Sequence, residues 1–253
     1  LVLAGGGHPH AGNVFIFVCG VFLVRSAGCV FNDVADRHID KHIERTRDRP
    51  ITSGKVSVKS ALWLCVFLLF LAFILVLFTN EKTIFLAFIA VILAAIYPFL
   101  KRMTFFPQCW LGLVFNGGVI MAFSAERNAI PGIAWVLYAS AVASTIAYDT
   151  MYGMVDRQDD LKIGVKSTAI LFGHYDRLMI ALCQVVSWCL LWVVGVYFQL
   201  NFWYYLGLFA AVFFIFYQQA LIWTREPACC FRAFINNHYL WAVVFFALVL
   251  AFL

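Results

Sequence analysis

ALWLCVFLLFLAFILVLF, at residues 61–78, is an uninterrupted run of 18 apolar residues. A helix needs about 20 predominantly apolar residues to cross the hydrocarbon core of a bilayer. With its flanks, at residues 57–79, the run has that length. A soluble domain of this size has too little interior to bury it. The run therefore predicts a transmembrane helix.

The composition of the whole chain extends this prediction. Of 253 residues, 64% are apolar and 12% are charged, against about 45–50% and about 25% in soluble domains. The net charge of +5 bears on membrane orientation and anionic ligands, and it does not indicate a nucleic-acid partner. The 8 cysteines lie scattered and favour neither a disulfide framework nor a zinc site. We expect an all-α, polytopic helical bundle in a lipid bilayer.

Other apolar segments of similar length recur along the chain, so we expect eight transmembrane helices in a single domain at residues 1–253. Their ends follow Gly, Pro, Asn and charged residues. The eight segments are 13–33, 57–79, 83–100, 107–124, 131–155, 178–200, 201–223 and 237–253. The chain begins at Leu1, without Met and inside an apolar stretch. This beginning suggests an incomplete N-terminus that lacks a preceding helix.

The charged residues are distributed unevenly among the loops. The loops after the first, third, fifth and seventh predicted helices, with their flanks, carry 15 of the 18 basic and 11 of the 13 acidic residues. Lys and Arg favour the cytoplasmic side of a membrane. We therefore expect these loops on the cytoplasmic side, or on the matrix side in an organelle.

Two groups of polar residues mark helix ends on this side. The first lies on one face if the first helix continues through it, and comprises Asn32, Asp36 and Asp40. The second lies on one face at the end of the fifth helix, and comprises Asp149, Tyr152, Asp156 and Asp160. Facing carboxylates repel unless cations lie between them, and Mg²⁺ binds through one or two carboxylates plus substrate phosphate oxygens. We predict a diphosphate site bridged by Mg²⁺; the alternative is that the carboxylates are solvated or neutralised by nearby Lys and Arg.

Basic residues follow both acidic groups. Those predicted to bind the outer oxygens of the diphosphate are Arg49, Lys162 and Lys166. The alternative role is anchoring to lipid headgroups, which we favour for Lys41, Lys59 and Arg225.

Arg25 lies inside the first apolar run, seven residues before Asn32 and on the same helical face. An intramembrane Arg faces the bundle interior and pairs with an anion. Two interpretations stay open. Arg25 binds a carboxylate or diphosphate of a substrate, or it forms a structural ion pair with one of the aspartates.

Taken together, the motifs resemble the signatures of the intramembrane prenyltransferases of the UbiA superfamily. The first is Asn32-Asp33-x-x-Asp36-x-x-x-Asp40, followed by Arg45 to Pro50 and by Ser53-Gly54. The second is Asp149-x-x-Tyr152-x-x-x-Asp156-x-x-x-Asp160, followed by Lys162 to Thr168. Residues 97–108 resemble the loop between them. Within the superfamily, residues 25–30 and 148–173 look most like bacterial 4-hydroxybenzoate polyprenyltransferases of ubiquinone biosynthesis.

The resemblance implies a fold and a reaction. The family has nine transmembrane helices, so the missing one is expected to be the first. The implied reaction moves a polyprenyl group from an allylic diphosphate to the ring carbon ortho to the hydroxyl of 4-hydroxybenzoate. Mg²⁺ is expected at Asp36, Asp40, Asp156 and Asp160, with Asn32 and Asp149 in support. The location implied is a bacterial inner membrane.

The resemblance also suggests roles around the acceptor. Asp149 is a candidate for taking up the ring proton, as is the released diphosphate. Arg25 is the candidate partner of the acceptor's carboxylate.

Other functions are compatible with parts of the pattern. A relative could use homogentisate, dihydroxynaphthoate or haem as acceptor. CDP-alcohol phosphotransferases also use membrane aspartates and Mg²⁺, but their Asp-Gly-x-x-Ala-Arg run does not occur in this sequence. A cation transporter would place acidic residues near the bilayer midplane, whereas both groups here lie at helix ends.

Overall fold

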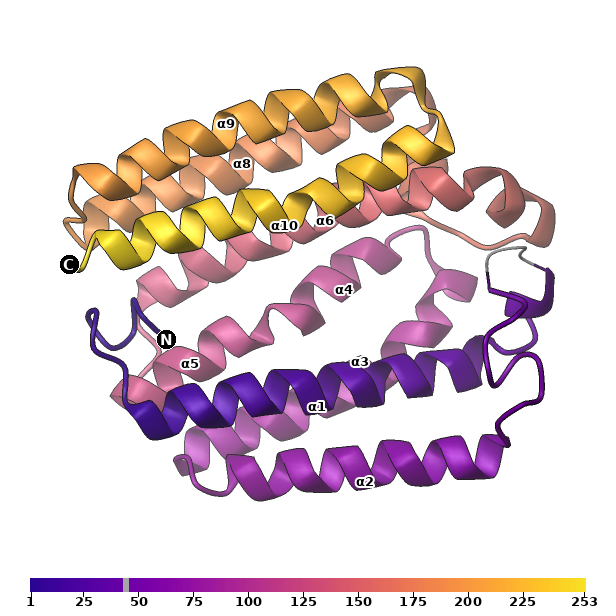
Figure 1. Cartoon of the computed structure of the whole chain (residues 1–253), viewed down its shortest axis with the longest axis horizontal. Coiled ribbons are helices and arrows are strands. Elements are labelled where there is room, and N and C mark those ends of the chain that lie inside the picture. The colour runs from indigo at the N-terminus through magenta and orange to yellow at the C-terminus, as the bar shows by residue number, and fades with distance from the viewer. Residues whose placement is uncertain (43–45) are drawn as a thin grey trace.

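Long helices run side by side between two ends of the molecule (Figure 1). The computed structural model describes residues 1–42 and 46–253, so Arg45 of the first motif lies outside the described residues. The side chains of His42, Lys101 and Arg102 also lie outside this description. The described residues form helices and turns, without a strand. The predicted all-α bundle is confirmed.

Ten α-helices and three short 3₁₀ helices make up the described part of the chain. The α-helices are α1 (Ala11–Asp36), α2 (Val58–Val76), α3 (Glu81–Met103), α4 (Pro107–Phe115), α5 (Gly117–Arg127), α6 (Gly132–Ile163), α7 (Thr168–Phe172), α8 (Asp176–Tyr197), α9 (Phe202–Leu221) and α10 (Pro227–Leu250). The 3₁₀ helices are η1 (Asp40–His42), η2 (Gly173–Tyr175) and η3 (Ile222–Thr224).

The predicted segments correspond to these helices. Seven stretches of the described residues are long and apolar enough to cross a membrane, with α4 and α5 joined in one and α7 and α8 in another. The eighth is α6, whose 32 residues suffice in length but include Asp, Ser, Thr and Tyr between the apolar positions. Large apolar side chains such as Phe70, Phe88 and Phe209 are exposed on the outside of the bundle. Such a surface suits lipid, and the chain is an integral membrane protein.

One predicted helix is broken. Segment 107–124 forms α4 and α5, which meet at Asn116. The side-chain nitrogen of Asn116 donates to the carbonyl of Gly112 at 2.8 Å and to the hydroxyl of Thr145 on α6 at 2.9 Å. Gly117 and Gly118 follow, and glycine has low helix propensity. The break is therefore held by one hydrogen bond within α4 and one to the neighbouring helix α6.

The last helix begins earlier than predicted. It starts at Pro227 rather than at Asn237, because proline suits the first position of a helix. Asn236 and Asn237, which look like helix-boundary residues in the sequence, are inside α10. The Asn236 carboxamide oxygen accepts a hydrogen bond from Gln218 on α9 at 3.0 Å.

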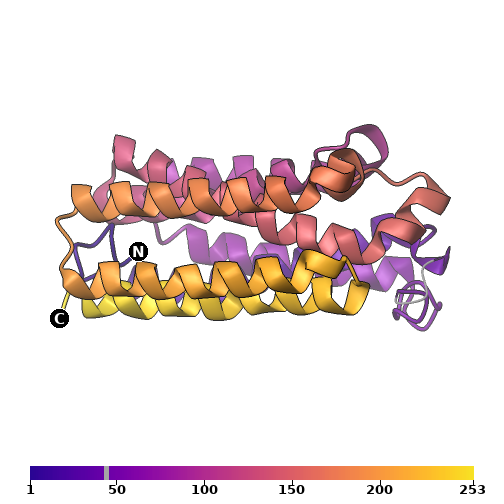
Figure 2. The ribbon, with the colours of Figure 1, turned by 90° about the horizontal axis from the view of Figure 1, so that it is seen from above.

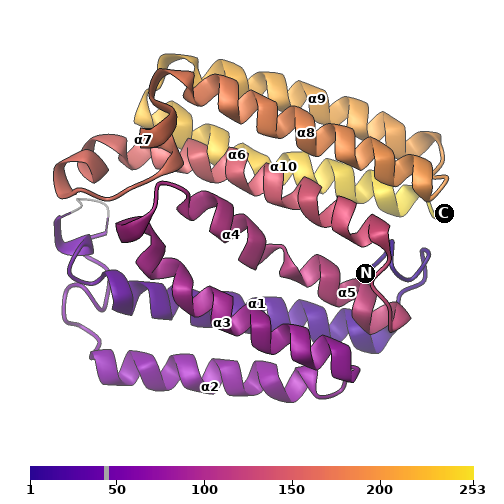
Figure 3. The same cartoon turned by 180° about the vertical axis from the view of Figure 1, so that it is seen from behind.

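The helices form two groups with α4 and α5 between them. One group comprises α1, α2 and α3, and the other comprises α6, α8, α9 and α10. Figure 3 shows α4 and α5 between α3 and α6, and both contact these two helices. Seen from above in Figure 2, the axes of the long helices are roughly aligned, and the connections between them lie at the two ends of the bundle.

Hydrogen bonds between connections identify the two ends. At the end that we call the acidic end, Lys166 donates to the carbonyl of Met103 at 3.2 Å, and Arg225 binds Asp176 at 2.9 Å. The predicted cytoplasmic loops therefore meet there. At the opposite end, Asn80 donates to the carbonyl of Ser124 at 2.6 Å and Lys82 to that of Asn128 at 2.8 Å.

Candidate active site at the acidic end

The end of α1 contributes two buried carboxylates. Asp36 is the last residue of the helix and is 1% exposed, and Asp40 is 4% exposed. The prediction that α1 continues through Asp40 is wrong. The chain leaves the helix after Asp36, where the Ile39 amide donates to the Asp36 carbonyl at 2.8 Å, and Asp40 opens η1. Both carboxylates are nevertheless at the same end of α1.

Arg49 binds carboxylates of this first group. Its guanidinium donates to Asp33 at 2.7 Å and to Asp40 at 3.2 Å. The loop is folded around it, because the Ser53 amide and hydroxyl both donate to the Arg49 carbonyl, at 2.8 Å and 2.9 Å. Arg49 thus neutralises part of the carboxylate charge, as the alternative interpretation expects, and its role in diphosphate binding stays a prediction. Asp33, which lies off the predicted face, is its second partner.

The second group lies on α6, which continues to Ile163, beyond the end of the predicted segment 131–155, so that Asp156 and Asp160 are helical. Asp160 is buried and Asp149, Tyr152 and Asp156 are half-buried. At i, i+3, i+7 and i+11 these residues share one face of the helix.

Close packing fixes the position of this part of α6. A Cβ at Gly153 would lie 3.2 Å from the Cβ of Ala169 on α7, so only glycine permits this approach without a shift. Thr150 and Thr168 are buried and their hydroxyls lie 2.7 Å apart. Gln108 on α4, also buried, accepts a hydrogen bond from the Thr168 amide at 3.0 Å. Gln108 therefore links the loop between the motifs to the second motif.

The chain segments around the ends of α1, α3 and α6 border one pocket. An open pocket of about 680 Å³ is bordered by Val34 and His38 from the end of α1, by Phe99 of α3 and by Ile163–Val165 from the end of α6. Tyr97 on α3 lies within electrostatic range of Asp36 on α1 and of Asp149 and Tyr152 on α6. Residues of α1, α3 and α6 are therefore near one another at Tyr97, and the juxtaposition of the two acidic groups around a metal stays a prediction.

Arg25 lies within α1, and its side chain is exposed, whereas the sequence predicted that it faces the bundle interior. Its guanidinium is 4.8 Å from the ring centroid of Phe115, the last residue of α4. It is also within electrostatic range of Asp149 and of Tyr148. Asp149 is the anion that the structural interpretation requires, and the Phe115 ring makes a cation–π contact with Arg25. Substrate binding by Arg25 stays a prediction.

Aromatic rings line the neighbouring surface of α6 and α10. The rings of Tyr152 and Phe234 have centroids 4.8 Å apart, and that of Tyr148 is 6.0 Å from Phe234. Tyr152 therefore belongs to an aromatic cluster beside the carboxylates of α6.

The two predicted lysines lie at the periphery. Lys162 is exposed and pairs with Asp159 at 3.0 Å. Lys166 lies with its ammonium 5.3 Å from the ring centroid of Phe105, next to the α3–α4 connection. Both are at the acidic end, and their roles in diphosphate binding stay predictions.

The donor set fits Mg²⁺ with a phosphate-bearing ligand. Carboxylate oxygens from the ends of α1 and α6 are the hard donors that Mg²⁺ prefers. In the described part of the chain no three Asp, Glu, His or Cys side chains converge closely enough to hold an ion by themselves. Mg²⁺ held by one or two carboxylates takes its remaining ligands from phosphate oxygens and water.

The chain was compared with models of known protein families. The model of the UbiA prenyltransferase family matches residues 1–252. The chain belongs to this family.

Relatives in the family match the chain along its whole length. A protein of Hahella chejuensis (strain KCTC 2396), named 4-hydroxybenzoate octaprenyltransferase, is 53% identical over 100% of this chain and 84% of its own length. A protein of the same name from Coxiella burnetii (strain CbuK_Q154) is 47% identical over 99% of this chain and 87% of its own.

Solved structures of UbiA homologues share the fold. The apo structure of a homologue from Aeropyrum pernix K1 has a TM-score of 0.86 at 21% identity, over 99% of this chain and 96% of that one. A homologue from Archaeoglobus fulgidus, bound to GPP and Mg²⁺, has a TM-score of 0.71 at 17% identity, over 98% of this chain and 92% of that one. At these identities the likeness establishes the fold alone.

The UbiA fold of this chain contains an ion cluster that the sequence interpretation missed. Asp176, the first residue of α8, is buried and binds Arg157 of α6 at 2.5 Å and Arg225 at 2.9 Å. Arg225 was predicted to anchor the chain to lipid, and its pairing with Asp176 corrects that prediction. The partners are far apart in sequence, so spacing could not reveal them. Because Arg157 follows Asp156, the cluster holds the end of α6 that carries the second motif.

Replacing Asp176 with Asn should destabilise this UbiA family member by about 3–5 kcal/mol, because it leaves two guanidinium groups without their buried partner. The matched control is Asp159→Asn, since Asp159 pairs with Lys162 in solvent and exposed pairs contribute about 0–1 kcal/mol. Denaturant titration in detergent measures both. Equal stability of the two variants would contradict the structural role of Asp176.

Proposed function

We propose that this chain transfers a polyprenyl group from an allylic polyprenyl diphosphate to the ring carbon of 4-hydroxybenzoate that is ortho to its hydroxyl, in ubiquinone biosynthesis. The observation that carries the proposal is that the buried carboxylates Asp36 and Asp40 at the end of α1 lie at the same end of the bundle as Asp160 at the end of α6. The names of relatives with 53% and 47% identity support the acceptor. Their names also make an octaprenyl diphosphate the donor to test first.

The carboxylates are proposed to hold the diphosphate through a metal. Mg²⁺ would be held by Asp36, Asp40, Asp156 and Asp160, with Asn32 and Asp149 supporting them. When bound, the ion supplies positive charge that stabilises the leaving diphosphate. The Archaeoglobus fulgidus homologue binds GPP together with Mg²⁺, which supports this chemistry for the family.

Basic side chains would complete the diphosphate site. Arg49, now bound to Asp33 and Asp40, can donate in a bidentate manner to phosphate oxygens. Lys162 and Lys166 would contact the outer oxygens. Departure of the diphosphate breaks the C–O bond and leaves an allylic cation.

The acceptor is proposed to lie between Arg25 and the second acidic group. Arg25 would bind the carboxylate of 4-hydroxybenzoate, which places the ring near Asp149. The ortho carbon attacks the allylic cation, and Asp149 or the released diphosphate takes up the ring proton. Tyr152 and the aromatic cluster around Phe234 would stabilise the cation, since aromatic faces attract positive charge.

The membrane location suits both the donor and the lipid product. We place the acidic end on the cytoplasmic side of a bacterial inner membrane, because the loops there carry most of the Lys and Arg residues. A nucleic-acid partner remains unexpected for this chain.

An acceptor screen tests the proposal. The full chain in phospholipid vesicles receives octaprenyl diphosphate and Mg²⁺, together with 4-hydroxybenzoate, homogentisate, dihydroxynaphthoate or haem. We expect a prenylated product from 4-hydroxybenzoate, detected by mass spectrometry, and its loss on chelation of Mg²⁺. Preferential transfer to another acceptor would refute the proposed substrate while leaving the family assignment intact.

A further inference from the structure

A pocket of about 460 Å³ opens between α8 and α9 where these helices reach the acidic end, and we call it the α8–α9 groove. Its apolar walls are Leu178 and Ala181 of α8 and Phe216 and Ala220 of α9. Leu178 and Phe216 are 55% and 70% exposed. The groove is therefore an apolar channel on the outer surface of the bundle, where a membrane protein meets lipid.

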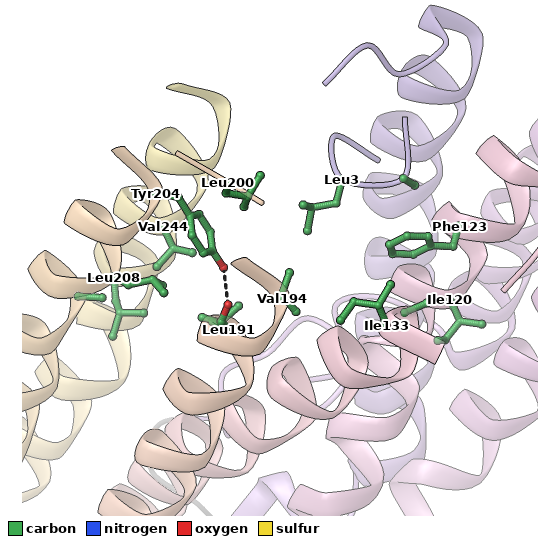
Figure 4. Close-up of a cluster of buried hydrophobic side chains, with 14 residues drawn as sticks. Leu3, Ile120, Phe123, Ile133, Leu191, Val194, Leu200, Tyr204, Leu208 and Val244 are labelled. Carbon is green, nitrogen blue, oxygen red and sulfur yellow. Dashed lines mark hydrogen bonds between the residues drawn. The ribbon is translucent and has the colours of Figure 1, made fainter. Parts of the chain in front are cut away.

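Contacts between α8 and α9 limit the depth of the groove. The Gln219 side-chain nitrogen, at the border of the groove, donates to the Gln184 side chain at 2.9 Å. Towards the opposite end, the Tyr204 hydroxyl donates to the Leu191 carbonyl at 3.0 Å within a buried apolar cluster (Figure 4). These contacts join the two helices away from the acidic end, so the groove is a bounded feature with one mouth at that end.

Arg177 lies at the mouth of the groove with an unneutralised charge. Its guanidinium carbon is 4.1 Å from the ring centroid of Trp223, and it donates to the Trp223 carbonyl at 3.3 Å. The neighbouring carboxylate of Asp176 is buried and already binds Arg157 and Arg225. Among the described residues, no carboxylate forms an ion pair with Arg177. Its positive charge is therefore available to an anion from outside the chain.

The residues at the mouth lie at the level of the membrane surface. The apolar stretches Thr168–Tyr197 and Phe202–Thr224 are long enough to cross a membrane, and the mouth is at the acidic end of both. Tyr175 and Trp223, which border the mouth, are 58% and 69% exposed. Exposed Tyr and Trp favour the layer between headgroups and acyl chains. The charged mouth therefore faces headgroups, and the apolar walls face acyl chains.

We propose that the α8–α9 groove binds one bilayer phospholipid that has an anionic headgroup. The phosphate would accept hydrogen bonds from the Arg177 guanidinium, and one acyl chain would lie between Leu178 and Phe216. The local charge selects an anionic lipid, because Arg157, Arg177 and Arg225 provide three positive charges around one buried carboxylate. A zwitterionic headgroup adds a cation that these arginines repel. This inference does not depend on the proposed prenyl transfer.

The bound lipid would also stabilise the fold. The Arg177 amide donates to the buried Asp176 carboxylate at 2.7 Å, so the lipid site adjoins the ion cluster that holds the end of α6. A ligand that binds the folded state alone raises stability by mass action. We therefore expect phosphatidylglycerol to raise the unfolding temperature of the chain above that in phosphatidylcholine, and to lose this effect in Arg177→Gln.

Photolabelling locates the lipid directly. The full chain in detergent micelles receives phosphatidylglycerol or phosphatidylcholine with the same diazirine-bearing acyl chain, and labelled peptides are identified by mass spectrometry. We expect phosphatidylglycerol to label residues 176–181 and 216–223 about tenfold more than phosphatidylcholine does. Arg177→Gln should reduce this labelling to the phosphatidylcholine level. The matched control is Arg232→Gln, because Arg232 is exposed on α10 near the acidic end and contacts Cys229 outside the groove.

A second variant tests the apolar part of the site and leaves Arg177 in place. Ala220→Trp puts a large side chain into the groove, so it should reduce labelling of the same two segments. Equal labelling by the two lipids, or unchanged labelling in folded Arg177→Gln or Ala220→Trp, would overturn the proposal. Excess glycerol 3-phosphate should not displace the probe, because it lacks acyl chains. Displacement by it would overturn the assignment to a lipid and indicate a site for a free phosphate.

Discussion

Asp156→Ala should abolish Mg²⁺-dependent transfer of a labelled polyprenyl group to 4-hydroxybenzoate, while the protein still inserts into the membrane. Asp156 lies on the α6 face that carries Asp149 and Asp160. Removing it would withdraw an oxygen ligand where the leaving diphosphate needs positive charge. Loss of one group that stabilises developing negative charge typically lowers kcat by about 10²–10³-fold, and loss of the ion itself exceeds this.

Asp36→Ala should have an equally large effect, since Asp36 is the buried carboxylate at the end of α1. Asp48→Ala is the matched control, because Asp48 lies at the same end with its side chain 85% exposed and a weak 3.7 Å contact to Arg47. Product formation at several Mg²⁺ concentrations measures all three variants. Substantial activity in Asp36→Ala or Asp156→Ala would refute the proposed metal site.

Arg25→Gln should lower kcat/KM for 4-hydroxybenzoate strongly and spare acceptors that lack a carboxylate. Loss of a hydrogen bond to a charged group costs about 1.5–3 kcal/mol, which corresponds to a loss of roughly 10-fold to 150-fold. The comparison acceptor is 4-hydroxybenzamide, whose neutral amide replaces the carboxylate. The ratio of the two kcat/KM values should therefore fall in the variant.

Competition between the two acceptors measures this ratio directly. Arg25→Lys serves as the control, because it keeps the positive charge and should retain part of the preference. A proportional loss for both acceptors in Arg25→Gln would support the alternative interpretation, in which Arg25 pairs structurally with Asp149.

Much of the fold could be predicted because hydropathy is a local property. Each apolar segment must cross the bilayer or be buried, whatever its neighbours are. Successive loops alternate between the two sides of the membrane, so the helix count also predicts which loops lie together. The hydrogen bonds at both ends agree with this prediction. The α6 face with Asp149, Asp156 and Asp160 was also predictable, since helical spacing alone places these residues together.

Deviations from helical spacing were not predictable in this way. Asp40 has the right interval to share a face with Asp36, but α1 ends at Asp36. The break at Asn116 depends on a hydrogen bond to Thr145 on α6. In both cases the local pattern permits a continuous helix, and the surrounding structure selects a different backbone path.

The sequence determined that the chain is a membrane helical bundle with two acidic helix ends on one side, because length, hydropathy and periodicity suffice for that conclusion. Only the tertiary structure decided which charges meet. It paired Asp176 with Arg157 and Arg225, joined Asn116 to Thr145 on α6, and buried Leu3 at the end opposite the carboxylates. These contacts join segments that are distant along the chain, and their energies depend on burial and distance, which no local pattern encodes.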